Sequence, residues 1–240
     1  MNNLIEKYKM YGAKKFVVYS ISEMYLRLWM QNVRNSYSQK GEDVEIDKLL
    51  KHKKKGFYVD VGANHPVRFN NTYRFYKEGW HGINIEPDPE NFEKIVKVRS
   101  RDVNLNLGVG KKSGELELYQ FIPDTLTTFS KDEANRYRSE GYILRGKRKV
   151  GVKPLSEIFD EYVRHKKIDF MSVDTEGFDL EVLKSNNWRR YRPKVVCVES
   201  RSFSSSPGSV DNRIRSYLIR VGYREYLHTG VNSIYIDKGK

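Results

Sequence analysis

The stretch Phe57-Tyr58-Val59-Asp60-Val61-Gly62-Ala63-Asn64 is a short apolar run that ends in an acid and a glycine. Its β-branched and aromatic residues favour a strand, and Gly62 allows a tight turn directly after it. Similar runs follow and alternate with helical patterns. We expect them to form strands over residues 82–86, 103–109, 115–119, 168–174, 194–199, 223–227 and 233–236. This pattern indicates an α/β domain whose mostly parallel sheet is closed by an antiparallel hairpin.

Helices are expected between these strands. Pro89 suits the first turn of one of them, and Gly79 suits the end of another. The predicted helices cover residues 72–78, 89–98, 156–164, 180–186 and 209–221. Ligands of such sheets bind beyond the carboxyl ends of the strands, so the site is expected there.

The composition limits the class of protein. The chain has 240 residues, of which 38% are hydrophobic, enough for one folded domain with a short appendage. The single cysteine, Cys197, lies in an apolar run and excludes a disulfide framework or a cysteine-based zinc site. The start of the chain lacks a secretory pattern, and no apolar run is long enough to span a membrane. We therefore expect a cytoplasmic protein.

The charge points to anionic partners without choosing among them. The chain has 44 Lys and Arg residues against 31 Asp and Glu residues, a formal net charge of +13. Nucleic acid, an anionic membrane and phosphorylated carriers are all compatible with it, as is a merely solvated basic surface.

Three segments are distinguished along the chain. Residues 1–35 show an amphipathic helical pattern, which predicts packing against the domain or a second copy, or peripheral docking at the inner membrane surface or on a glycosyltransferase. Residues 36–240 form the main domain. Within it, residues 122–150 have weak periodicity and many charges, and we interpret them as a partly helical insertion on the acceptor side.

The turn after the first strand favours S-adenosylmethionine over a dinucleotide. Asn64, His65 and Pro66 occupy positions where a pyrophosphate site needs glycines. S-adenosylmethionine has no phosphate, and it needs a tight turn and an acid, which Asp60 and Gly62 supply. Glu86 ends the second predicted strand, where a carboxylate can accept both ribose hydroxyls.

Several motifs together resemble the FkbM family of methyltransferases. In chain order they are residues 38–43 (SQKGED), 59–64 (VDVGAN), 71–73 (NTY), 79–87 (GWHGINIEP), 168–177 (IDFMSVDTEG), 182–184 (VLK) and 193–199 (PKVVCVE). The resemblance implies the Rossmann-like, seven-stranded class I methyltransferase fold and the cofactor S-adenosylmethionine. It also implies methylation of a hydroxyl group, often on a sugar. Many members carry an acid and a glycine where this chain has His65 and Pro66.

The resemblance places the reaction beside residues 174–177. Asp174 is expected to position or deprotonate the acceptor, and Glu176 to hold the acceptor or the cofactor ammonium group. The alternative is that these acids cap the following helix. His65 is a second candidate base. For contacts with the acceptor, the sequence suggests Glu199, His228 and Arg145.

Further contacts with the cofactor are predicted from position. Gln39 would cover the cofactor, Asn64 and Thr72 would hold its carboxylate, and Asp102 would take the adenine amino group. Asp174, Glu176 and His65 offer donors for a divalent metal, which the sequence permits but does not favour.

We therefore expect an S-adenosylmethionine-dependent O-methyltransferase that acts on a saccharide, possessing or adjoining an anionic group, in surface polysaccharide or glycan modification. The first alternative is an RNA methyltransferase or nucleic-acid-binding protein, motivated by the charge but lacking an aromatic RNA platform. The second alternative is a non-catalytic scaffold, which the presence of the acids Asp60 and Glu86 disfavours.

Overall fold

The computed structural model describes residues 35–200 and 211–239. The predicted extension, residues 1–35, lies almost entirely outside this part of the chain. Within the described residues, no helix has the length and apolar character needed to cross a bilayer.

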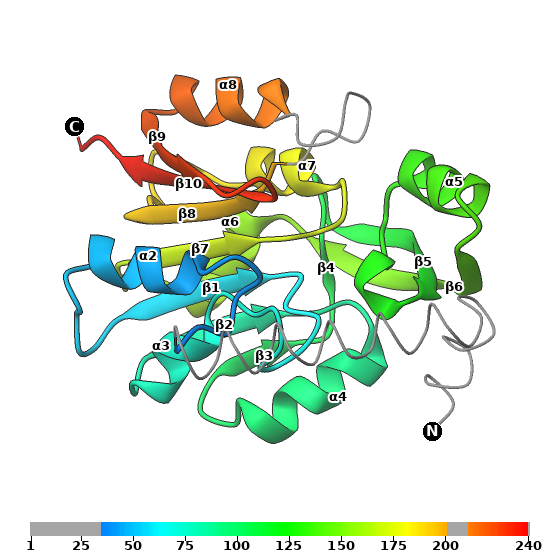
Figure 1. Ribbon diagram of the computed structural model, residues 1–240, viewed down its shortest axis with the longest axis horizontal. Coiled ribbons are helices and arrows are strands. Elements are labelled where there is room, and N and C mark those ends of the chain that lie inside the picture. Colours follow the sequence, from blue (N-terminus) through cyan, green and yellow to red (C-terminus); the bar gives the residue numbers. More distant parts are fainter. Residues whose placement is uncertain (1–34, 201–210, 240) are drawn as a thin grey trace.

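A seven-stranded sheet forms the centre of the molecule (Figure 1). Its strands, in spatial order, are β3 (Val103–Leu105), β2 (His81–Ile85), β1 (Phe57–Val61), β7 (Phe170–Val173), β8 (Val195–Glu199), β10 (Asn232–Asp237) and β9 (Tyr223–His228). The first five run parallel, and β10 is antiparallel to both of its neighbours. This is the class I methyltransferase fold, with the closing hairpin that the sequence predicts.

Helices cover both faces of this sheet (Figure 1). They are α2 (Glu42–Leu49), α3 (Tyr73–Lys77), α4 (Pro89–Val98), α6 (Leu155–Tyr162), α7 (Asp179–Lys184) and α8 (Asn212–Arg220). Successive strand residues point to opposite faces. Val59 accordingly packs in the core cluster shared with α6, α7 and α8, whereas Tyr58 packs in the cluster of α2 and α3, which also contains the buried Cys197.

A smaller sheet lies beside the first. It contains β4 (Gly108–Val109), β6 (Ile143–Lys153) and β5 (Gly114–Ile122), and the connection from β5 to β6 carries the short 3-10 helix η1 (Asp124–Leu126) and α5 (Lys131–Ser139). The single strand expected over residues 103–109 is therefore wrong: β3 ends at Leu105, and β4 pairs with β6 instead. Residues 122–150 contain the helical part expected, but also most of the long strand β6, which the sequence did not predict.

The carboxyl ends of β1, β2, β7 and β8 meet at one edge of the large sheet, on the side of β5 and α5 (Figure 1). Side chains that follow these strands therefore converge on a shared space.

Candidate active site

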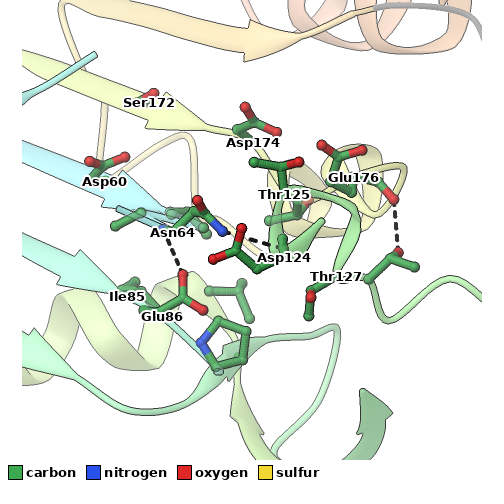
Figure 2. Close-up of a pocket in the computed structure, with 18 of the residues that line it drawn as sticks. Asp60, Asn64, Ile85, Glu86, Asp124, Thr125, Thr127, Ser172, Asp174 and Glu176 are labelled. Carbon is green, nitrogen blue, oxygen red and sulfur yellow. Dashed lines mark hydrogen bonds between the residues drawn. The ribbon is translucent and has the colours of Figure 1, made fainter. Parts of the chain in front are cut away.

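A cleft of about 880 Å³, measured with its open mouth, lies beyond the ends of β1, β2 and β7 (Figure 2). Its polar lining comes from the last residues of β1 and β7, from the segments that follow the three strands and from the β5–β6 connection. It comprises Asp60, Asn64, Arg68, Asn70, Asn71, Glu86, Asp124, Thr125, Thr127, Thr128, Ser172, Asp174, Thr175 and Glu176.

Gly62 forms the turn that brings β1 to the cleft. Its φ of +76° favours glycine, and a Cβ atom at this position would lie 1.8 Å from the backbone oxygen of Asp174. Because the backbones of the two strand ends approach this closely, any side chain at residue 62 would separate them.

The carboxylate of Asp60 lines the cleft, and hydrogen bonds from two neighbouring side chains hold it in position. Its Oδ2 accepts hydrogen bonds from Asn70 Nδ2 at 2.9 Å and from Thr72 Oγ1 at 2.7 Å. Burial raises the pKa of Asp60, while the charge of Arg99 and these two hydrogen bonds act in the opposite direction. Thr72 is fully buried and does not line the cleft, so the structure gives it the role of orienting Asp60 in place of the predicted cofactor contact.

Arg99 is a fully buried guanidinium that holds the loop between β1 and α3. It donates to the backbone oxygen of Pro66 at 3.0 Å and to Thr72 Oγ1 at 2.6 Å, and it pairs with Asp102 at 3.2 Å. Asp102 precedes β3, far from the carboxyl ends of the strands, and also accepts hydrogen bonds from Tyr58 and Asn84. The structure therefore does not bring Asp102 to the cleft, where an adenine contact would require it.

Glu86 follows β2 and presents its carboxyl to the cleft (Figure 2). The backbone N–H of Asn64 donates to Oε2 at 2.7 Å, and that of Asp88 donates to Oε1 at 2.8 Å. Desolvation by burial nevertheless raises the pKa of Glu86 to about 8. A pair of ribose hydroxyls would supply donors that favour the ionised form.

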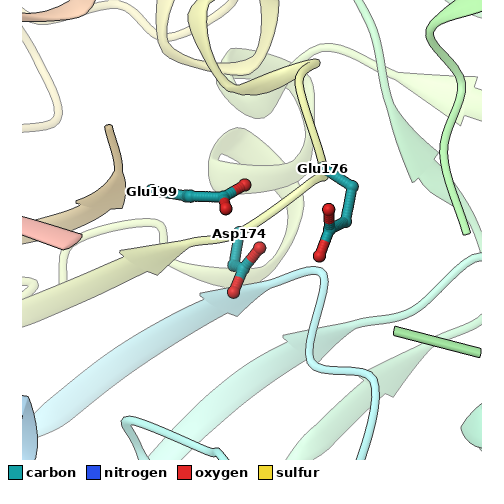
Figure 3. Close-up of side chains that lie close together, drawn as sticks. All are labelled: Asp174, Glu176 and Glu199. Atoms are coloured by element: carbon teal, nitrogen blue, oxygen red, sulfur yellow. The ribbon is translucent and has the colours of Figure 1, made fainter. Parts of the chain in front are cut away.

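Asp174, Glu176 and Glu199 form a cluster at the end of the cleft nearest β7 and β8 (Figure 3). One carboxylate oxygen from each lies within 4.8 Å of those of the other two. The cluster offers oxygen donors of the kind that hard divalent cations take. Its third member is Glu199, whereas the sequence had suggested His65.

The loop carrying Glu176 is held by its neighbours. Tyr137 of α5 donates its hydroxyl to Glu176 Oε2 at 2.7 Å, and Thr128 Oγ1 donates to the Glu176 backbone oxygen at 2.8 Å. Asp179 accepts from the N–H groups of Thr175 at 2.9 Å and Gly177 at 3.1 Å. Asp179 thus closes the loop ahead of α7, and no side chain caps the first turn of this helix. The side chains of Asp174 and Glu176 line the cleft instead of capping the helix.

Besides Thr72, Asp102 and Glu199, four predicted site residues are not among those lining the cleft. His65 Nδ1 accepts from the N–H groups of Val67 and Arg68, at 3.1 and 3.0 Å, and so closes its own turn. The remaining three are Arg145, paired with Glu90 at 2.9 Å; His228, whose Nδ1 lies 3.0 Å from Ser233 Oγ; and Gln39, exposed ahead of α2. Glu199 does not line the cleft, but its carboxylate belongs to the cluster with Asp174 and Glu176.

The sequence missed several cleft residues. Asn70 and Asn71 lie within or beside a quoted motif, and Asn71 Nδ2 donates to Ser172 Oγ at 3.0 Å. Asn64 Nδ2 donates to the backbone oxygen of Asp124 at 3.4 Å, which ties the β1 turn to the β5–β6 connection. No local pattern could have predicted this last contact, because it joins segments 60 residues apart.

Comparison with protein families agrees with this geometry. The family model described as the methyltransferase FkbM domain matches residues 60–225, more than half of the chain and both sides of the cleft. The chain belongs to the FkbM methyltransferase family. Among curated proteins, no sequence matches significantly.

The FkbM chain is also similar to solved structures. A putative caffeoyl-CoA O-methyltransferase from Staphylococcus aureus shows 9% identity and a TM-score of 0.49, with 98% of each chain covered. An O-methyltransferase from Bacillus cereus, solved in complex with SAH, shows 9% identity and a TM-score of 0.44 over 90% of this chain and 89% of that one. The Methanococcus jannaschii fibrillarin pre-rRNA processing protein shows 11% identity and a TM-score of 0.46 over 78% and 69%.

Three residues that the sequence predicts as cofactor contacts, Asp60, Gly62 and Glu86, border one cavity. The family to which the chain belongs consists of methyltransferases. The protein is therefore an S-adenosylmethionine-dependent methyltransferase.

Proposed function

We propose that this methyltransferase transfers the methyl group to a hydroxyl of a saccharide, in the modification of a surface polysaccharide or another glycan. The observation that carries the proposal is the placement of Asp174 and Glu176 in the wall of the cleft that also contains Asp60 and Glu86. A sugar hydroxyl has a high pKa and is a poor nucleophile, so a nearby carboxylate that accepts its proton favours the reaction.

The cofactor end of the cleft is built from Glu86, Asp60 and the Gly62 turn. S-adenosylmethionine, when bound, supplies an electrophilic methyl group. Glu86 would accept hydrogen bonds from the ribose hydroxyls, and Asp60 would face the ammonium group. Gly62 allows the ligand to approach the backbone closely.

The acceptor end would hold a hydroxylated molecule. A carboxylate oxygen of Asp174 would accept the proton of the reacting hydroxyl, and Glu176, oriented by Tyr137, would hold a second hydroxyl. Thr127 adds support: its Oγ1 is buried in the cleft wall and has no hydrogen-bond partner among the described residues. A polyhydroxylated acceptor could satisfy this hydroxyl.

The test is transfer of a labelled methyl group from S-adenosylmethionine to glycan fractions. We expect Asp174→Asn to lower kcat by about 100-fold or more, while S-adenosylhomocysteine still binds in calorimetry. The matched control, Asp132→Asn, changes an exposed acid of α5 and should retain activity. Unchanged turnover in Asp174→Asn, or label incorporated into RNA alone, would contradict the proposal. Loss of activity with a chelator, restored by Mg²⁺, would assign the carboxylate cluster to a metal instead.

A further inference from the structure

A second charged region lies at the edge of the sheet opposite the cleft. It consists of the three loops that precede β1, β7 and β8, namely residues 50–56, 163–169 and 185–194. These loops contain four, three and four Lys or Arg residues, and only one acid, Asp169. They therefore account for most of the formal net charge of +13. We call their eleven basic residues the basic edge: Lys51, Lys53, Lys54, Lys55, Arg164, Lys166, Lys167, Arg189, Arg190, Arg192 and Lys194.

The sheet itself brings these loops together. Tyr58, Phe170 and Val195 are aligned in register on β1, β7 and β8, so the loops before them begin at the same level. Hydrogen bonds continue between the loops: the N–H of Asp169 donates to Phe57 O at 2.9 Å, and that of Lys194 donates to Ile168 O at 3.0 Å. Since neighbouring strands are about 4.8 Å apart, the three loops form a row about 10 Å wide. In Figure 1 they lie at the left end of the sheet, away from α5.

Most of this charge is exposed and uncompensated. Lys51, Lys54, Lys55, Lys167 and Arg189 are exposed, and among residues 35–200 and 211–239 no carboxylate forms an ion pair with any of them. The acids nearby are already engaged by other members of the basic edge: Asp169 by Lys53, Asp160 by Arg190 and Asp237 by Arg192.

We propose that the basic edge docks the protein on an anionic membrane surface, through the phosphate groups of the lipids. Seven of its eleven members are lysines, and attraction to an anionic leaflet needs only such charges near the surface, with no shaped pocket. The large aromatic side chains within or directly after these loops, Phe57, Trp188 and Tyr191, are all buried. They cannot stack on bases, as recognition of single-stranded RNA requires.

Docking through the basic edge determines to which side of the membrane-bound protein the cleft opens. The five residues of β1 separate the basic edge from Gly62 by about 17 Å. The cleft then opens away from the bilayer, and an acceptor must reach it from the aqueous side. This inference concerns a different surface from the proposed function and does not depend on it.

Co-sedimentation of the full chain with vesicles tests the proposal. Vesicles of phosphatidylcholine mixed with phosphatidylglycerol should retain the protein, those of phosphatidylcholine alone should not, and high salt should release it. The triple variant Lys54→Gln, Lys55→Gln, Lys167→Gln should bind the anionic vesicles roughly 100-fold more weakly, since each lysine contributes roughly 5-fold. Its unfolding midpoint should stay close to that of the wild type, because these side chains are exposed.

A charge-matched control separates the basic edge from the net charge. Lys131→Gln, Arg138→Gln, Lys149→Gln removes three exposed charges from α5 and β6, and it should bind the vesicles nearly as the wild type does. Equal weakening of the two triple variants would overturn the proposal, as would full binding by the basic-edge variant. Wild-type binding to single-stranded RNA without binding to anionic vesicles would assign the surface to nucleic acid and also overturn it.

Discussion

At the scale of single residues, the folded protein without a ligand disfavours the ionised form of Glu86, the form that ribose hydroxyls would stabilise. Both carboxylate oxygens of Glu86 accept backbone hydrogen bonds, yet its burial raises its pKa from the ordinary 4.5 to about 8. Without a ligand, the folded protein therefore keeps a proton on this carboxyl at neutral pH. A ligand with two adjacent hydroxyls would stabilise the ionised form that the empty cleft disfavours.

This shift predicts a pH dependence of stability. Between pH 4.5 and 8 the folded state holds a proton on Glu86 that the unfolded chain has lost. The contribution of Glu86 to stability is therefore complete at low pH and falls as the pH rises through about 8. The free energy of unfolding of the wild type, relative to Glu86→Gln, should decrease by a few kcal/mol between about pH 5 and pH 8. Parallel curves for the two proteins in urea denaturation would contradict this.

At the scale of elements, the loop between β1 and α3 depends on a residue that follows α4. Arg99 holds Pro66 and Thr72, and Thr72 holds Asp60. We expect Arg99→Met to lower the free energy of unfolding by about 3 kcal/mol, because it leaves the buried Asp102 without its cation. The folded variant should also bind S-adenosylhomocysteine more weakly. Arg99→Lys should recover part of the lost stability and part of the lost affinity.

Arg101→Met provides the control for this variant. Arg101 is exposed two residues further along and stacks on Tyr76, so its loss should change stability by less than about 0.5 kcal/mol. Urea denaturation and calorimetry with the ligand measure both effects. If Arg99→Met bound the ligand with wild-type affinity, Arg99 would have no part in positioning the loop.

The elements that the sequence predicted well carry local signals. Helix α4 has the predicted bounds, since Asp88 caps the N–H groups of Glu90 and Asn91 and Pro89 occupies the first turn. Helix α2 was missed because Glu42, Asp43 and Asp47 occupy its buried face, where an apolar stripe would be the usual signal. Strand β6 was missed because exposed charged residues dominate residues 145–149.

The site residues also divide into those with a local sequence signal and those without one. Asp60, Gly62, Glu86, Asp174 and Glu176 could be placed from their positions at strand ends, and all five line the cleft. The cofactor contact predicted for Asp102 was misplaced because this residue directly precedes β3 and therefore lies at the end of the sheet opposite the cleft. Contacts made by the β5–β6 connection are long-range, and no local pattern encodes them.

At the scale of the whole molecule, charge is separated along the strands. The carboxylates gather where the parallel strands end, and the lysines gather where they begin. The fold therefore gives one edge of the sheet the acids that a sulfonium cofactor and a sugar would contact. It gives the other edge the cations that an anionic surface would attract.

The central claim is that Asp60 and Glu86 border one site for the cofactor, with Asp174 facing the acceptor side. A crystal structure of the protein with S-adenosylhomocysteine tests it most directly. We predict that the ribose hydroxyls lie within hydrogen-bond distance of the Glu86 carboxylate, with the homocysteine end beside Asp60 and the sulfur towards Asp174. A ligand bound outside this cleft, or inside it with the ribose away from Glu86, would contradict the account.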